Sequence, residues 1–129
     1  MNTNLIAEFI GHDNNEFIGI EEAENMLLEM SNFRPSKTGL PMVIWIMPDI
    51  HHQHGPRIKV QKKHGDKVID PNSWASVTIE DEPEVVVGKL PINDFNLVKE
   101  FIILNKEKLL EVWNDEIDPI DFAKIIKKV

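Results

Sequence analysis

The chain has 129 residues, of which 42% are hydrophobic and 28% are charged, and it contains no cysteine. This length fits one domain with or without an appendage, and a chain without cysteine has no disulfide, thiolate metal site or cysteine nucleophile. No uninterrupted apolar run reaches the roughly 18 residues of a membrane-spanning helix, and the first residues lack the pattern of a secretory signal. We therefore expect a soluble, cytoplasmic protein that does not enter a membrane.

Charge is distributed unevenly along the chain. The formal net charge is -8, but residues 51–79 carry five Lys or Arg against two Asp, and they hold four of the five histidines. An acidic chain repels phosphate over long distances, which argues against general binding to nucleic acids. The middle segment is the exception, because it can form a positive patch or pair with acidic neighbours. Its cations are Arg57, Lys59, Lys62, Lys63 and Lys67.

The N-terminal part predicts an extension. Two short strand-like segments precede a helix over Glu21–Met30, whose apolar residues recur at spacings of three and four. Residues 31–41 contain Pro, Ser, Gly and Asn and predict a loop. We place the domain boundary there, between an extension over residues 1–38 and a main domain over residues 39–129.

Several short strands are expected next. The first is an apolar run with the composition of a buried strand, and the next two alternate between apolar and polar residues. The expected strands are Met42–Met47, Arg57–Gln61, Trp74–Glu80 and Glu84–Val87. In the third, Ala75, Val77 and Ile79 face away from Trp74. Packing on the sheet and a stacking platform for a ligand are the two roles considered for Trp74.

The clearest helix is expected over residues 94–113. Asn93 is its predicted cap, and a broad apolar stripe includes Leu97, Phe101 and Leu104. A short terminal helix is expected to begin at Asp118-Pro119. The order of the elements predicts an α+β fold, with a small, mainly antiparallel sheet packed on the long helix.

Four histidines form the most unusual concentration of functional side chains: His51, His52, His54 and His64. In an extended backbone His52 and His54 point to the same side, and Asp49 lies nearby. Imidazole binds transition metals and titrates near neutral pH, so His52, His54 and Asp49 are the candidate catalytic residues and the two histidines are candidate metal ligands. A polar surface loop is the alternative, and the chain has no His-Glu-x-x-His motif.

Complete catalytic motifs are missing elsewhere. A restriction-type nuclease follows its first metal-binding Asp with acid-x-Lys on the next strand, where this chain has Arg57-Ile58-Lys59. The sequence has neither a Gly-x-Ser-x-Gly elbow nor a phosphate-binding P-loop. We therefore expect no cofactor and no metal as a first assignment.

From about Gly39 to Trp113 the chain resembles a family of small bacterial proteins known only as a domain of unknown function. The resemblance is carried by a His/Pro-rich segment before a short strand (residues 52–60), Gly88-Lys89-Leu90-Pro91, and a long helix ending in Leu-x-x-x-Trp (Leu109 to Trp113). That family usually has alternating histidines on the short strand, where this chain has Arg57 and Lys59. The resemblance implies the fold and a small protein partner, in arrangements similar to toxin–antitoxin pairs.

Two functions follow from the sequence. The first is a noncatalytic interaction module that binds a protein partner or a second copy through Arg57, Lys59, Lys62 and Lys63. The alternative is a small hydrolase or nuclease that uses the histidine segment around a metal or as a base. Nucleic-acid binding through the middle segment is disfavoured by the net charge of -8.

Overall fold

The computed structural model describes residues 31–46, 55–68 and 73–129. The strands form a single sheet in the order β1-β2-β3-β4-β5, and every neighbouring pair is antiparallel. The strands are β1 (Asn32–Phe33), β2 (Ile44–Trp45), β3 (Arg57–Gln61), β4 (Trp74–Thr78) and β5 (Val85–Val87). The described helices are α3 (Pro35–Thr38), α4 (Ile92–Trp113) and α5 (Pro119–Ala123). This arrangement confirms the predicted α+β fold.

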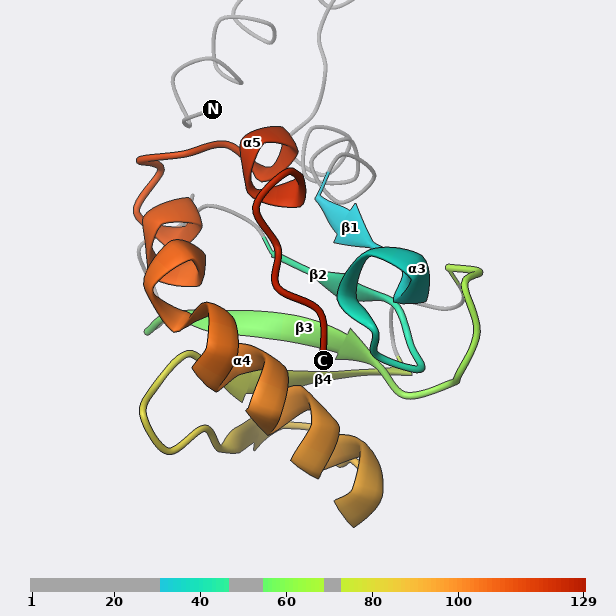
Figure 1. Cartoon of the computed structure of the whole chain (residues 1–129). Helices are drawn as coiled ribbons and strands as arrows, with labels where there is room; N and C mark the ends of the chain where they lie inside the picture. The colour runs from blue at the N-terminus through green and yellow to red at the C-terminus, as the bar shows by residue number, and fades with distance from the viewer. Residues whose placement is uncertain (1–30, 47–54, 69–72) are drawn as a thin grey trace, which may run out of the picture.

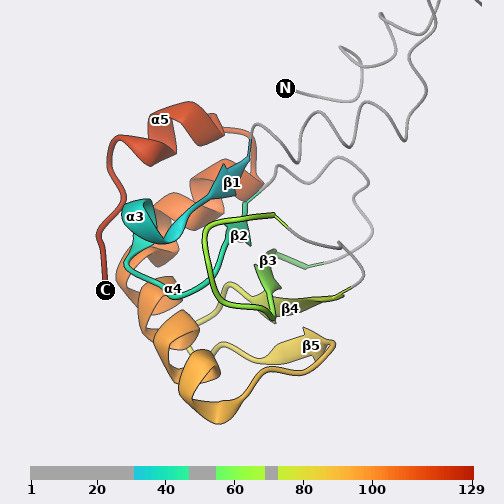
Figure 2. The ribbon, with the colours of Figure 1, turned by 90° about the vertical axis from the view of Figure 1, so that its right-hand side faces the viewer.

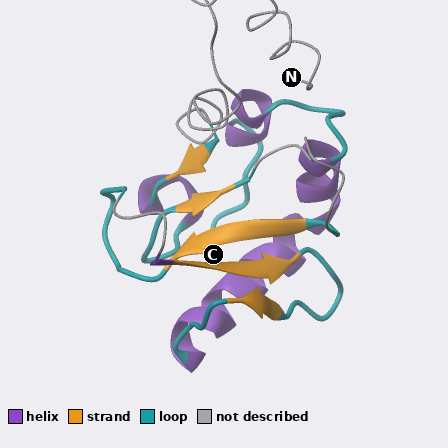
Figure 3. Ribbon diagram, turned by 180° about the vertical axis from the view of Figure 1, so that it is seen from behind, coloured by secondary structure: helices purple, strands orange, loops and turns teal. Residues whose placement is uncertain are grey.

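The long helix α4 covers one face of the sheet. It lies in front of the strands in Figure 1 and behind them in Figure 3, and Figure 2 shows α4, α5 and the C-terminus on the same side. Apolar residues of the inner sheet face, including Ile58, Val60 and Val77, form the core with α4 residues such as Phe101 and Ile102. None of the helices in the described part of the chain combines the length and the apolar character needed to cross a bilayer.

The start and the apolar stripe of α4 differ from the prediction. The cap position is Pro91, with no side-chain cap hydrogen bond, so Asn93 lies inside the first turn. Proline sets the extended backbone that leads into a helix, which explains why the helix begins earlier than expected. Leu97 and Leu104 are 38% and 43% exposed. The stripe that packs on the sheet is therefore narrower than the apolar stripe in the sequence.

The loop predicted over residues 31–41 is wrong in part. Asn32 and Phe33 pair with Trp45 and Ile44 as β1, and α3 follows directly. Gly39 ends α3 with a φ of 81°, where glycine is favoured because it has no Cβ. The predicted boundary at residue 38 therefore leaves β1, which pairs with β2 in the sheet, on the side of the extension. Residues 1–30, which contain the other elements of the predicted extension, lie outside the described residues.

The C-terminal segment is tied to the rest of the fold. Asp118 caps α5 by accepting a hydrogen bond from the Asp121 backbone N–H at 2.7 Å, as the sequence predicts. Further on, the Val129 backbone N–H donates to the Thr38 carbonyl oxygen at 3.0 Å. The last residues therefore connect α5 with α3, and the chain end lies beside Gly39.

The free edge of β5 is irregular. Ser76 pairs with Val87 and Val77 pairs with Val85, so Val86 is an extra residue in a β-bulge. Bulges at sheet edges discourage pairing with another strand. The turn before β5 carries Asp81, Glu82 and Glu84, and these like charges repel a similar approaching edge. Extension of the sheet through β5 is therefore disfavoured.

Candidate protein-binding face

The outer face of β3 carries two cations. Ile58 and Val60 are fully buried on the side of α4, and Arg57 and Lys59 alternate with them on the opposite side and are half-buried. The alternation predicted from the sequence is confirmed. Because successive side chains of a strand point to opposite faces, the strand itself positions both cations away from the core.

Two tryptophans pack over this outer face. The rings of Trp45 on β2 and Trp74 on β4 stack with their centroids 4.0 Å apart and their planes at 26°. Both strands are neighbours of β3, so the pair bridges the middle strand. Lys59 Nζ lies 5.2 Å from the centroid of the Trp74 ring, within the range of a cation–π interaction. The packing role considered for Trp74 is confirmed, and a cation lies against its ring.

Gln61 holds the loop that follows β3. Its side chain is fully buried, and Nε2 donates to the backbone carbonyls of Lys63 and Lys67 at 3.1 and 2.9 Å. The Gly65 backbone N–H also donates to the Pro41 carbonyl at 2.9 Å. These bonds fix the backbone that carries Lys62 and Lys63. The loop is thus a defined platform for its two lysines.

His64 connects the same loop to the long helix. Its Nε2 lies 2.9 Å from each carboxylate oxygen of Asp94 in the first turn of α4. The side chain of His64 is 58% exposed, whereas that of Asp94 is 10% exposed. The carboxylate also lies near the positive end of the helix dipole. His64 therefore has a structural partner that the sequence did not indicate.

The cations of this face lack acidic partners in the part of the chain that the structure describes. The ion pairs there join His64 to Asp94, Lys106 to Asp81, and two pairs within α4 and α5. Arg57 Nε approaches only the Gly55 carbonyl, at 3.5 Å. We define the cationic face as Arg57, Lys59, Lys62 and Lys63. Its positive charge is not compensated by nearby carboxylates of the described residues.

The second predicted site is the histidine segment with Asp49. Asp49, His51, His52 and His54 lie outside the described residues. Among residues 31–46, 55–68 and 73–129, no group of three or more His, Asp or Glu is arranged to hold a metal ion. Of the four clustered histidines, only His64 falls in these ranges, and it binds Asp94.

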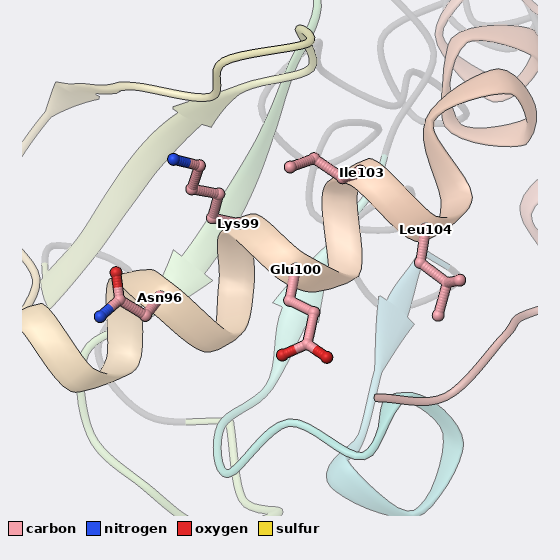
Figure 4. A pocket seen from close by; sticks show the side chains of 5 residues that line it. All are labelled: Asn96, Lys99, Glu100, Ile103 and Leu104. Atoms are coloured by element: carbon pink, nitrogen blue, oxygen red, sulfur yellow. The ribbon is translucent and has the colours of Figure 1, made fainter.

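A groove of about 370 Å³ lies on the outer surface of α4. Figure 4 shows its five lining side chains, all of which project from this one helix. They are Asn96, Lys99, Glu100, Ile103 and Leu104. The single Lys and single Glu do not form a catalytic set with a nucleophile or a histidine. The groove therefore gives no support to an enzymatic function.

Sequence reasoning missed the contacts made between elements. Trp45 and Trp74 are far apart in sequence, and their stacking depends on which strands flank β3. The His64–Asp94 pair likewise joins residues 30 positions apart. No local signal marks these pairs. Alternation along β3 was the available signal, and it located Arg57 and Lys59.

Comparisons with known proteins give no relative: no family model, no curated protein and no solved structure matches this chain.

Proposed function

We propose that this protein is a noncatalytic interaction module that binds an acidic protein surface through its cationic face. The observation that carries the proposal is the set of four cations on β3 and the following loop, for which the described residues provide no carboxylate. Uncompensated charge on a defined scaffold attracts a partner of opposite charge and sets its orientation.

The scaffold beneath these cations supports a binding role. The ring of Trp74 lies against the ammonium group of Lys59. Gln61 fixes the backbone of the loop that carries Lys62 and Lys63. A backbone that is already held in place loses less conformational entropy on binding, so the same contacts give a higher affinity. The family resemblance adds a cellular setting to the proposal, namely a small partner in a pair similar to a toxin and an antitoxin.

Charge reversal tests the proposal. The test variant carries Arg57→Glu, Lys59→Glu, Lys62→Glu and Lys63→Glu, and the control carries Lys99→Glu, Lys124→Glu, Lys127→Glu and Lys128→Glu. Both variants have the same net charge, and the control changes α4 and the C-terminal segment only. Immobilised wild type and control are expected to capture the same acidic protein from a lysate of the source cell. If the partner is a second copy, both are expected to capture a differently tagged copy that is added to the assay. The test variant should lose at least about 90% of that capture, equivalent to a tenfold weaker complex.

Two results contradict this function. One is equal capture by the test variant and the wild type after circular dichroism has shown that both are folded. The other is a wild-type chain that retains no protein beyond the bare resin.

A further inference from the structure

The turn after β4 is rich in carboxylates, and the loop after β3, at the other end of the β3–β4 pair, is rich in lysines. In the register of this pair, Arg57 lies opposite Thr78 at one end and Gln61 lies opposite Trp74 at the other. Figure 3 shows the turn after β4 and the loop after β3 beyond opposite ends of the strands. We define the acidic turn as Glu80, Asp81, Glu82 and Glu84, and the lysine loop as Lys62, Lys63 and Lys67.

These charges are only partly compensated within the described part of the chain. In the acidic turn, Asp81 pairs with Lys106 at 2.6 Å but is 89% exposed, and Glu80 accepts a hydrogen bond from the Thr78 hydroxyl. No described ion pair involves Glu82 or Glu84, or any of the three lysines of the lysine loop. Between β3 and β4 the sequence also has two carboxylates, Asp66 and Asp70, of which Asp66 lies among the described residues. His64 in the same loop is held by Asp94.

We propose that two copies of this chain form an antiparallel two-fold dimer, in which the lysine loop of each copy contacts the acidic turn of the other. Reversing the direction of one hairpin places opposite charges together at both ends, whereas a parallel arrangement places like charges together. Each β3 of five residues spans roughly 17 Å, so the two contacts lie on either side of the two-fold axis. A self-complementary interface of this kind is the commonest form of homodimer.

A second copy is favoured over another acidic partner because this chain supplies both complementary surfaces. The inference rests on the proposed function, in which Lys62 and Lys63 are contact residues. Pairs between exposed charges are individually weak, so we expect a dimer at high protein concentration that dissociates on dilution. At about 0.15 M salt the Debye length is roughly 8 Å, which screens the repulsion between two chains of net charge -8 while contacts at shorter range persist.

A charge swap tests the dimer. The first variant carries Lys62→Glu, Lys63→Glu and Lys67→Glu, and the second carries Glu80→Lys, Glu82→Lys and Glu84→Lys. Each variant alone is expected to be monomeric, because every antiparallel contact then joins like charges. Their equimolar mixture should recover the dimer mass, because all contacts in the mixed pair are complementary. Both variants stay negatively charged overall, so general attraction between the two chains does not explain recovery.

The measurement is sedimentation equilibrium up to roughly millimolar protein. The matched control, with Lys124→Glu, Lys127→Glu and Lys128→Glu, has the same net charge as the first variant and should dimerise like wild type. Circular dichroism checks the fold of each protein. If a triple variant does not fold, Lys63→Glu and Glu82→Lys replace the two sets, with a weaker dimer expected for each and partial recovery in the mixture.

The results separate this inference from the proposed function. A wild-type monomer at every concentration, a reversed variant that dimerises like wild type, or a mixture that stays monomeric overturns the dimer. If another acidic protein is captured by a monomeric wild type and lost on reversal of the cationic face, the dimer is overturned and the binding function stands. Capture that survives this reversal, in a chain that does not dimerise, overturns both.

Discussion

The side chain of Asn105 and the backbone of Lys127 form a reciprocal pair of hydrogen bonds. Asn105 Nδ2 donates to the Lys127 carbonyl at 2.9 Å, and the Lys127 N–H donates to Asn105 Oδ1 at 2.9 Å. Asn105 is buried on α4, so this pair attaches the C-terminal segment to the helix that covers the core. A polar residue in an otherwise apolar stripe therefore has a structural role.

Replacing Asn105 with alanine is expected to lower the free energy of unfolding by about 1–3 kcal/mol, because two backbone groups of Lys127 lose their partner. Urea denaturation followed by circular dichroism measures the change. The matched control is Asn96→Ala on the exposed side of the same helix, which should change stability by less than about 0.5 kcal/mol. Equal effects of the two substitutions would show that the bonds to Lys127 contribute nothing.

Gly39→Ala is expected to be strongly destabilising. Its φ is 81°, and an added Cβ would collide with the Val129 carbonyl oxygen, a backbone atom that cannot rotate away. The strained backbone alone costs about 1–2 kcal/mol, and the collision adds to it. Gly55→Ala is the control, because nothing lies within 4 Å of the position that its added methyl group would occupy. A melting temperature of Gly39→Ala equal to that of the control would contradict the described approach of the C-terminus.

Breaking the His64–Asp94 contact is expected to loosen the lysine loop. In a double-mutant cycle with His64→Ala and Asp94→Ala, the coupling free energy should be about 0.5–1 kcal/mol, near the lower end for a hydrogen bond because His64 is 58% exposed. Hydrogen exchange of the Gly65 amide, which binds the Pro41 carbonyl, gives a local measurement. Its exchange should accelerate in His64→Ala, and unchanged protection would show that the contact does not hold the loop.

Lys59→Met tests the contact between the cation and Trp74. Methionine keeps the apolar length of the side chain but removes the charge, so the expected loss is about 0.5–1 kcal/mol. Lys63→Met, at an exposed loop position, is the control and should leave the free energy of unfolding unchanged. Tryptophan fluorescence should also change in Lys59→Met alone. A larger loss from the Lys63 substitution would contradict the assignment of Lys59 to the ring.

Local patterns were sufficient for several elements. Alternation predicted β3 over Arg57–Gln61 and the side of each of its residues, and Asp118 correctly marked the start of α5. Residues 31–41 were misread because Pro and Gly, which usually indicate loops, here begin and end the short helix α3. As a result, β1 was not predicted, because a strand of two residues is too short to show a periodic pattern.

By itself, the sequence determined the fold class, the long helix and the outward direction of Arg57 and Lys59, because these depend on periodicity between residues close in the chain. Only the tertiary structure decided that Trp45 stacks on Trp74, that His64 binds Asp94, and that lysines and carboxylates occupy opposite ends of one hairpin. These relationships depend on strand order and register. Both are set by packing between residues that are distant in the chain, so no local pattern encodes them.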